Sequence, residues 1–155
     1  MTDESMMQEA ISQARAALAM DEVPVGCAVL HVPTDRIIGR GHNRRECDAD
    51  PTAHAEMIAL REAAAALGHW RLNECAIAIT LEPCPMCAGA IVNARVGRVI
   101  FGCDDPKAGA IRSLFQICDD PRLNHRAEIL GGVMAQQCSD LLREFFRAQR
   151  ACGKK

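Results

Sequence analysis

A continuous apolar run, Cys75–Leu81, restricts the fold of this chain more than any other segment. A strand that is apolar along its length rather than at alternate positions is covered on both faces, so the run predicts a central strand. The chain continues into Pro83-Cys84-Pro85-Met86-Cys87, whose two prolines suit the first turn of a helix that continues from Met86 to Ala94. A buried strand followed at once by a helix indicates a sheet with helices packed on it.

The rest of the chain alternates between helix-like and strand-like segments. Apolar residues at helical spacing predict helices over residues 5–20, from Thr52 as N-cap to about Leu67, and from about Met134 to Ala151. Strands are expected at Val25–Val32, Arg36–Gly41, Arg98–Gly102 and Ala127–Leu130, a turn at Pro33-Thr34-Asp35 and a short helix at Ser113–Cys118. The first two strands should pair antiparallel, because their connection is short, and the strands on either side of the Met86–Ala94 helix should be parallel.

This order of elements predicts a three-layer α/β/α fold, in which a mixed five-stranded sheet carries helices on both faces. A chain of 155 residues has the size of one domain with one core, so we expect a single domain over 1–155. The nine cysteines are odd in number and no export signal precedes them, which argues against a disulfide framework. No apolar stretch is long enough to span a membrane, and the acidic start is unlike a signal peptide, so we expect a cytoplasmic protein.

Two short segments carry the residues for metal chemistry, and each begins a predicted helix. Cys84 and Cys87 are three residues apart and share one helix face, and His54 begins the segment His54-Ala55-Glu56. Two thiolates and one imidazole form a ligand set that suits one zinc ion per chain. Three protein ligands leave the fourth position of a tetrahedral zinc free for water, as in catalytic sites, and zinc lowers the pKa of that water. Glu56 is the carboxylate placed to move the protons, provided that the helix end points into the site.

Each segment alone has a plainer interpretation. A lone C-x-x-C is also found in redox motifs and in half of a structural zinc site, and H-x-E occurs often by chance. Together, each opening a helix after a predicted strand, they match the signature of zinc deaminases that act on nucleobases. The other histidines lack such a context, and surface or supporting roles are expected for His31, His42 and His69.

Six stretches of the sequence resemble bacterial tRNA-specific adenosine deaminases, members of the cytidine and deoxycytidylate deaminase-like zinc superfamily. The stretches are residues 22–26 (EVPVG), 50–56 (DPTAHAE), 80–90 (TLEPCPMCAGA), 97–102 (GRVIFG), 123–126 (LNHR) and 141–147 (LLREFFR). The first four recur in free-base deaminases, whereas the last two favour the tRNA enzymes. The chain departs from the family pattern by an extra residue around Cys27-Ala28, and by Ile111 and Arg112 where small residues are usual.

The resemblance implies a cytidine-deaminase-like fold, a homodimer, and deamination of the wobble adenosine in the anticodon loop of an arginine tRNA with an ACG anticodon. It further implies that Asn43 hydrogen-bonds the purine, that the backbone N–H of Ala55 binds its forming carbonyl and that Val25 lines the pocket. Candidates for the RNA surface are Asp105, Lys107, Asn124, His125, Phe145, Phe146, Arg147 and Arg150.

Two other functions use the same zinc ligands. A free nucleobase deaminase, for guanine or cytosine, would not need the basic end formed by Arg143, Arg147, Arg150, Lys154 and Lys155. The net charge of −2 does not by itself indicate a nucleic-acid binder, and the basic end is also explained as a solvated helix face. A non-catalytic zinc module that binds RNA is the third alternative, but such a module has no use for Glu56.

Overall fold

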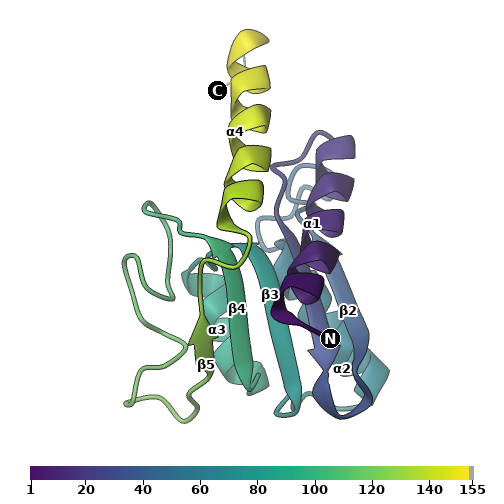
Figure 1. The fold of residues 1–155 in the computed structure, drawn as a ribbon, viewed down its shortest axis with the longest axis vertical. Coiled ribbons are helices and arrows are strands. Elements are labelled where there is room, and N and C mark those ends of the chain that lie inside the picture. Colours follow the sequence, from purple (N-terminus) through teal and green to yellow (C-terminus); the bar gives the residue numbers. More distant parts are fainter. Residues whose placement is uncertain (154–155) are drawn as a thin grey trace.

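The computed structural model describes residues 1–153 (Figure 1). Lys154 and Lys155, part of the basic end noted in the sequence, lie outside the described residues. The elements in chain order are α1 (Asp3–Ala19), β1 (Gly26–His31), a 3₁₀ turn (Val32–Thr34), β2 (Arg36–His42), α2 (Ala55–Leu67), β3 (Cys75–Leu81), α3 (Pro85–Ala94), β4 (Arg98–Cys103), β5 (Glu128–Leu130) and α4 (Ala135–Ala151).

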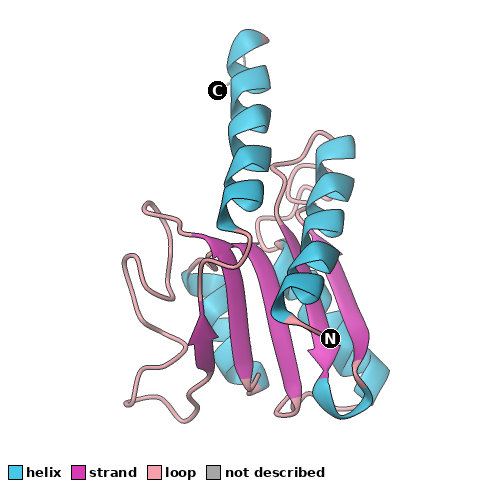
Figure 2. Cartoon of the chain, viewed as in Figure 1, coloured by secondary structure: helices cyan, strands magenta, loops and turns pink. Residues whose placement is uncertain are grey.

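Within residues 1–153 the strands form one five-stranded sheet in the order β2-β1-β3-β4-β5. Strand β1 pairs antiparallel with both β2 and β3, whereas β3, β4 and β5 are parallel. Helices α2 and α3 cover one face and α1 the other, and α4 rises beyond the sheet edge at which β3 and β4 end (Figures 1 and 2). The predicted three-layer α/β/α fold and its mixed sheet are therefore confirmed.

The sheet separates two cores because side chains alternate along its strands. On β3, Ile77 and Ile79 join the core under α2 and α3, whereas Ala76 and Ala78 join the core under α1. The small residues on the second face let α1 approach closely: a Cβ atom on Gly26 would collide with the Ala10 carbonyl oxygen. Because Gly26 opens β1 beside the end of β3, this packing holds the amino end of β1, the carboxyl end of β3 and thus the start of α3 in fixed relative positions.

Two local predictions are wrong, because in each case other hydrogen bonds replace the expected helical ones. Thr52 does not cap α2; its N–H and hydroxyl both donate to Asp50 at 2.8 Å, and His54 takes the N-cap position instead. The segment Ser113–Cys118 is not a helix. The N–H of Leu114 donates to the Gly109 carbonyl and that of Ile117 to the Ala110 carbonyl, so hydrogen bonds within the loop replace those of a helix.

The remaining bounds agree with the predictions to within about two residues, which is the usual uncertainty at element ends. All nine cysteines are free thiols; Cys27, Cys75 and Cys138 are buried, and Cys103 is half-buried. Among residues 1–153, no helix is both long and apolar enough to cross a membrane.

Candidate active site

A cavity of about 280 Å³ opens where α2 and α3 begin, beside the ends of β3 and β4. Its walls come from the segment before β1 and the loop after β2, from the end of β3 and the starts of α2 and α3, from the loop after β4, and from α4. The lining residues are Val23, Val25, Asn43, Arg45, His54, Ala55, Glu56, Leu81, Glu82, Cys84, Asp105, Ala108 and Phe146. The predicted catalytic and metal-binding residues are thus brought together with the predicted purine contacts.

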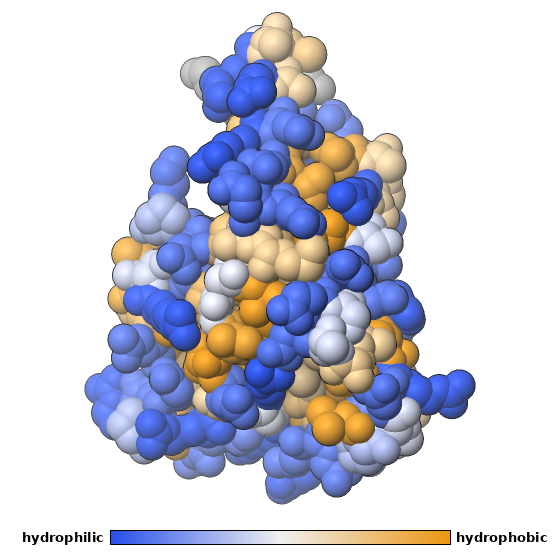
Figure 3. Space-filling view, viewed as in Figure 1, coloured by the Kyte–Doolittle hydropathy of each residue, from blue (hydrophilic) through white to orange (hydrophobic). Residues whose placement is uncertain are grey.

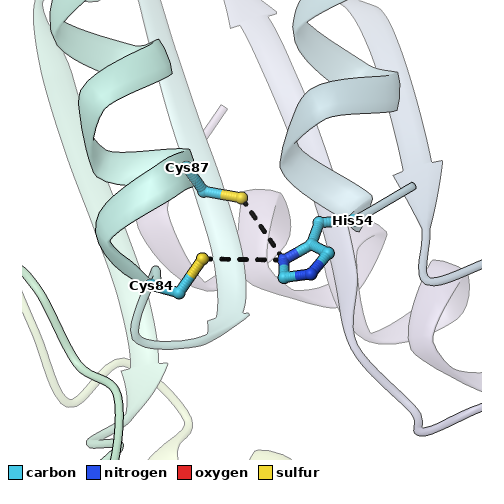
Figure 4. Close-up of side chains that lie close together, drawn as sticks. All are labelled: His54, Cys84 and Cys87. Carbon is cyan, nitrogen blue, oxygen red and sulfur yellow. Dashed lines mark hydrogen bonds between the residues drawn. The ribbon is translucent and has the colours of Figure 1, made fainter. Parts of the chain in front are cut away.

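His54, Cys84 and Cys87 point toward one another from the N-terminal ends of α2 and α3 (Figure 4). The His54 Nδ1 atom lies 3.6 Å from Cys84 Sγ and 3.5 Å from Cys87 Sγ. A tetrahedral zinc with ordinary Zn–S and Zn–N bonds would separate a sulfur from a nitrogen by about 3.6 Å. Both nitrogen–sulfur distances therefore match those of a tetrahedral zinc site, and all three donor atoms lie within 4.8 Å of one another.

The charge state of the cluster also suits a cation. A hydrogen bond from the Cys87 thiol, together with the neighbouring His54, lowers the pKa of Cys84 to about 4 although burial opposes the shift. Cys84 is therefore a thiolate at neutral pH, the form that binds metal. The Cys84 N-cap position at the start of α3 favours that negative charge as well, because helix N-termini carry positive potential.

Glu56 lies in the first turn of α2, buried, and lines the same cavity as His54. The condition set by the sequence is met: the helix end points into the cavity, so two residues that do not share a helix face both reach the site. Burial raises the pKa of Glu56. Its Oε2 atom has no hydrogen-bond partner among the described residues, which is rare for a buried carboxylate. A carboxyl group with a raised pKa and a free oxygen in a cavity is suited to accept and return a proton.

Asn43 is buried beside the cavity with its amide orientation fixed by the backbone. Its Nδ2 donates to the Val23 carbonyl at 3.2 Å, and its Oδ1 accepts the N–H of Arg45 at 3.0 Å. An amide can form further bonds, so one N–H and one oxygen lone pair are left for a ligand. Such a donor–acceptor pair is complementary to the edge of a purine base.

Comparison with known proteins assigns the chain to a family. A family model described as MafB19-like deaminase matches residues 1–150. The tRNA-specific adenosine deaminase of Bacillus subtilis is 48% identical over 96% of this chain and 91% of its own length. That of Haemophilus influenzae is 47% identical over 96% of this chain and 85% of its own. The chain belongs to the tRNA-specific adenosine deaminase family.

Solved structures extend the comparison to the fold of the deaminase. A structure from studies of A-to-I editing by tRNA:A34 deaminases superposes with a TM-score of 0.84 at 38% identity, covering 89% of this chain and 99% of that one. Guanine deaminase from Nitrosomonas europaea reaches a TM-score of 0.76 at 25% identity, covering 92% of this chain and 83% of that one. The fold is thus shared with enzymes for both tRNA and free bases, and the greater likeness is to the former.

Glu82 organises the loop that follows β4 in the deaminase. Its buried carboxylate accepts the N–H groups of Asp105, Ile111, Arg112 and Ser113 at 2.8–3.1 Å and the Ser113 hydroxyl at 2.5 Å. Burial raises its pKa, but these hydrogen bonds outweigh that effect and lower it to about 2. The loop that departs from the family pattern is therefore anchored through its backbone, with the Ile111 side chain buried.

Glu82→Ala is expected to destabilise the deaminase by at least about 3 kcal/mol, because several buried N–H groups would lose their acceptor together. Urea unfolding of the variant measures this change. The matched control is Glu62→Ala, which removes an exposed carboxylate from α2 and should change the free energy of unfolding by less than about 0.5 kcal/mol. Equal unfolding midpoints for the two variants would contradict the anchoring role.

The predicted RNA-contact residues do not all lie at the cavity. Asp105 and Phe146 line the cavity; Lys107 is exposed on the same loop as Asp105, and Arg147 and Arg150 are exposed on α4. Phe145 is buried, and its ring packs edge-on against Phe146 at 5.4 Å, so it supports its neighbour rather than facing solvent.

Asn124 and His125 are not brought to the cavity; His125 Nε2 lies 2.6 Å from the Val96 carbonyl, before the start of β4. The RNA contacts themselves stay predictions.

Sequence reasoning missed three charged residues at or beside the cavity: Arg45 and Glu82, which line it, and Glu22, which binds the adjoining loop. Glu22 and Glu82 are buried acids without a cationic partner among the described residues, each bound to the backbone of a loop beside the cavity. The sequence offered one indication of these two acids, namely an acidic residue at the edge of an apolar segment. In the case of Glu82 this position is directly after β3. Arg45 carried no signal, because an arginine in a polar loop is ordinary.

Proposed function

We propose that this protein is a zinc-dependent hydrolase that converts adenosine to inosine at the wobble position of a tRNA anticodon loop, with an arginine tRNA of ACG anticodon as the first candidate. The observation that carries the proposal is the exposed Phe146 ring, which α4 brings to the cavity that contains the zinc ligands and Glu56. An exposed aromatic ring at the rim offers a stacking surface to an unpaired base of a loop. The names of the curated relatives point to the same substrate.

The reaction consumes one water and releases one ammonia. His54, Cys84 and Cys87 would hold the zinc, which when bound supplies a Lewis acid that activates water. Glu56 takes the proton that the water loses, delivers it to N1 of the purine, and later carries a proton to the departing amine. Adenosine in a loop is already unpaired, so placing it in the cavity costs little.

The remaining cavity residues bind and orient the base. The free N–H and lone pair of the Asn43 amide would pair with the purine edge, and Val25 would pack against the ring. The N–H of Ala55 has no partner within α2, because it lies in the first turn, and it would donate to the carbonyl oxygen that replaces the amine.

Free guanine is the second candidate substrate, favoured by the fold shared with the guanine deaminase from Nitrosomonas europaea. A substrate panel separates the two candidates. The purified protein would be incubated with a tRNA transcript of ACG anticodon and, separately, with guanine, adenine and cytosine, and the ammonia released would be measured. We expect ammonia from the tRNA alone; release from guanine at a higher kcat/KM would overturn the proposal. The third alternative, a zinc module without activity, is disfavoured by the buried Glu56 beside the ligands.

We also propose that residues 1–155 form one domain, that two copies form a homodimer and that the enzyme works in the cytoplasm, where its tRNA substrate is. The outer surface of α2 and α3 supports the dimer: Met57, Ala64, Ala90 and Ala94 line a groove there beside the exposed Trp70. A helix surface of small and apolar residues suits close packing against a second copy. Sedimentation equilibrium of the zinc-loaded protein tests the proposal, and a monomer at micromolar concentration would contradict it.

The helix α4 yields a prediction about RNA binding. Its surface in view in Figure 3 is largely hydrophilic, and Arg147 and Arg150 are exposed one turn apart, next to Phe146. Removing both charges, in Arg147→Ala with Arg150→Ala, should weaken tRNA binding and flatten the slope of log K against log salt by about 1.4, as expected for two single-strand phosphate contacts. Thermal stability and zinc content should hardly change, because exposed charges contribute little to folding.

The matched control is Arg36→Ala with Arg71→Ala, two exposed arginines at the opposite end of the sheet. This pair removes the same charge, so an effect of net charge alone would appear equally in both double variants. Equal salt slopes for the two would contradict a specific RNA contact by α4.

A further inference from the structure

Two neighbouring arginines in the loop after β2 differ in how their charges are used. Arg44 forms a bidentate ion pair with Asp48, with nitrogen–oxygen distances of 2.9 and 3.0 Å. Arg45 is exposed, and its guanidinium has no hydrogen bond or ion pair with any residue of 1–153, yet it lines the cavity. The charge of Arg45 is therefore available to a ligand at the cavity, whereas that of Arg44 is neutralised within the protein.

The backbone that carries Arg45 is held in place from both sides. The N–H of Arg45 donates to the Asn43 side chain, and the N–H groups of Glu46 and Cys47 donate to the buried carboxylate of Glu22, each at 3.0 Å. A buried carboxylate that binds two consecutive N–H groups fixes a loop more firmly than neutral acceptors do. These hydrogen bonds fix the backbone of the loop at Arg45, and they therefore also fix the direction in which its side chain leaves the loop.

Arg45 differs in the sign of its charge from the acidic residues that line the cavity. Three of the lining residues, Glu56, Glu82 and Asp105, are acids, and among the described lining residues Arg45 is the only lysine or arginine. The lining residues that are exposed to solvent are Arg45 and Phe146, which places both on the rim, while the groups that meet the base lie inside. A nucleotide that enters base first would leave its phosphates at this rim, where Arg45 is the one exposed cation among the described lining residues.

We propose that Arg45 binds one of the two phosphates that flank the target adenosine, as a phosphate subsite on the rim of the cavity. The proposal rests on the proposed function, because a free base carries no phosphate. A guanidinium offers two parallel N–H donors to a phosphate, and such charge-assisted pairs are stronger than neutral hydrogen bonds. Arg45 would then help the enzyme to prefer an adenosine within a chain over the free base.

The test pairs a protein variant with a modified RNA. An anticodon stem-loop would be synthesised with an uncharged methylphosphonate in place of the phosphate on the 5′ side or on the 3′ side of the target adenosine. The kcat/KM for inosine formation would be measured with the wild type, with Arg45→Gln and with Arg44→Gln as the neighbouring control. Zinc content and melting temperature of each variant confirm that it is folded.

For the unmodified RNA we expect Arg45→Gln to lower kcat/KM by about 10-fold or more, the effect of losing one charge-assisted hydrogen bond. One of the two methylphosphonates should lower the kcat/KM of the wild type to a similar degree. The same modified RNA should lower the kcat/KM of Arg45→Gln by less than about 2-fold, because this variant already lacks the guanidinium that binds the phosphate. Arg44→Gln should remain as sensitive to that modification as the wild type.

Independent, multiplying losses for both modified RNAs, or an unchanged kcat/KM in Arg45→Gln, would overturn the phosphate subsite while the tRNA function stands. No inosine from any stem-loop or full tRNA with the wild type, combined with ammonia from free guanine, would instead overturn the proposed function, and the subsite with it.

Discussion

Glu56→Gln is expected to lower the turnover of tRNA by about 10²–10⁴-fold, the usual effect of losing a general acid–base. The glutamine has nearly the same shape but cannot accept the proton from water and return it to the purine. Zinc binding should persist, because Glu56 is not among the three donors that form the metal cluster. Single-turnover formation of inosine, together with zinc analysis and a binding assay with tRNA, measures the three properties separately.

The control for this variant is Glu62→Gln, which changes an exposed carboxylate on the same helix. It should leave turnover unchanged within about 2-fold, since surface substitutions away from a site have small effects. Stability should not fall in Glu56→Gln either, because the buried Oε2 atom has no hydrogen bond among the described residues to lose. Turnover near that of the wild type would remove Glu56 from the proton transfer.

Cys84→Ala should abolish zinc binding and strongly destabilise the protein. The remaining His54 and Cys87 cannot hold the metal in a tetrahedral site, and metal binding contributes directly to the free energy of folding. The loss should exceed about 4 kcal/mol in urea unfolding, the stabilisation that a ligand gives at a thousandfold excess over its dissociation constant. A chelator should lower the melting temperature of the wild type and leave that of the variant unchanged.

Cys152→Ser provides the control, because Cys152 is an exposed cysteine at the end of α4, outside the cluster. It should retain one zinc per chain and the stability of the wild type. Full zinc occupancy in Cys84→Ala would show that the metal is held by a different set of donors.

The parts of the fold that local patterns determine were predicted from the sequence. β3 spans Cys75–Leu81 as expected, because a run without polar alternation can only be buried on both faces. The separation of Cys84 and Cys87 places both at one helix end, and the third ligand, His54, followed from combining that segment with His54-Ala55-Glu56 in the zinc-deaminase signature. Glu56 followed from its distance to His54, once α2 was expected to begin near that residue.

The parts that depend on particular side-chain hydrogen bonds were not predicted. Thr52 has the side chain of a helix cap, but Asp50 binds it in a turn, and the cap moves to His54. The loop after β4 has helix-like composition at Ser113–Cys118, but Glu82 binds the N–H groups of Arg112 and Ser113. Glu82 and these two residues are 30 and 31 positions apart in sequence, so no local pattern contains them. Asp50 and Thr52 are only two positions apart, and there one local pattern, a turn, replaces another, a helix cap.

Tertiary contacts also explain why the residues on the rim of the cavity could not all be predicted from the sequence. Phe145 and Phe146 are adjacent and alike, and only the packing of α4 decides that the first is buried and the second is exposed at the cavity. Arg44 and Arg45 are likewise adjacent, and only the position of Asp48 decides which of them keeps a free charge. Where two adjacent residues are chemically alike, the tertiary structure decides which of them is available at the cavity.

The central claim is that the cavity acts on the wobble adenosine of a tRNA, and mapping the product tests it most directly. The purified zinc-loaded protein would be incubated with an arginine tRNA transcript of ACG anticodon, which would then be cut into fragments and analysed by mass spectrometry for inosine. A matched transcript with guanosine at position 34 would serve as the control. The account predicts one inosine, at position 34 of the first transcript, and none in the second. Unmodified adenosine at position 34, with the same protein releasing ammonia from free guanine, would contradict it.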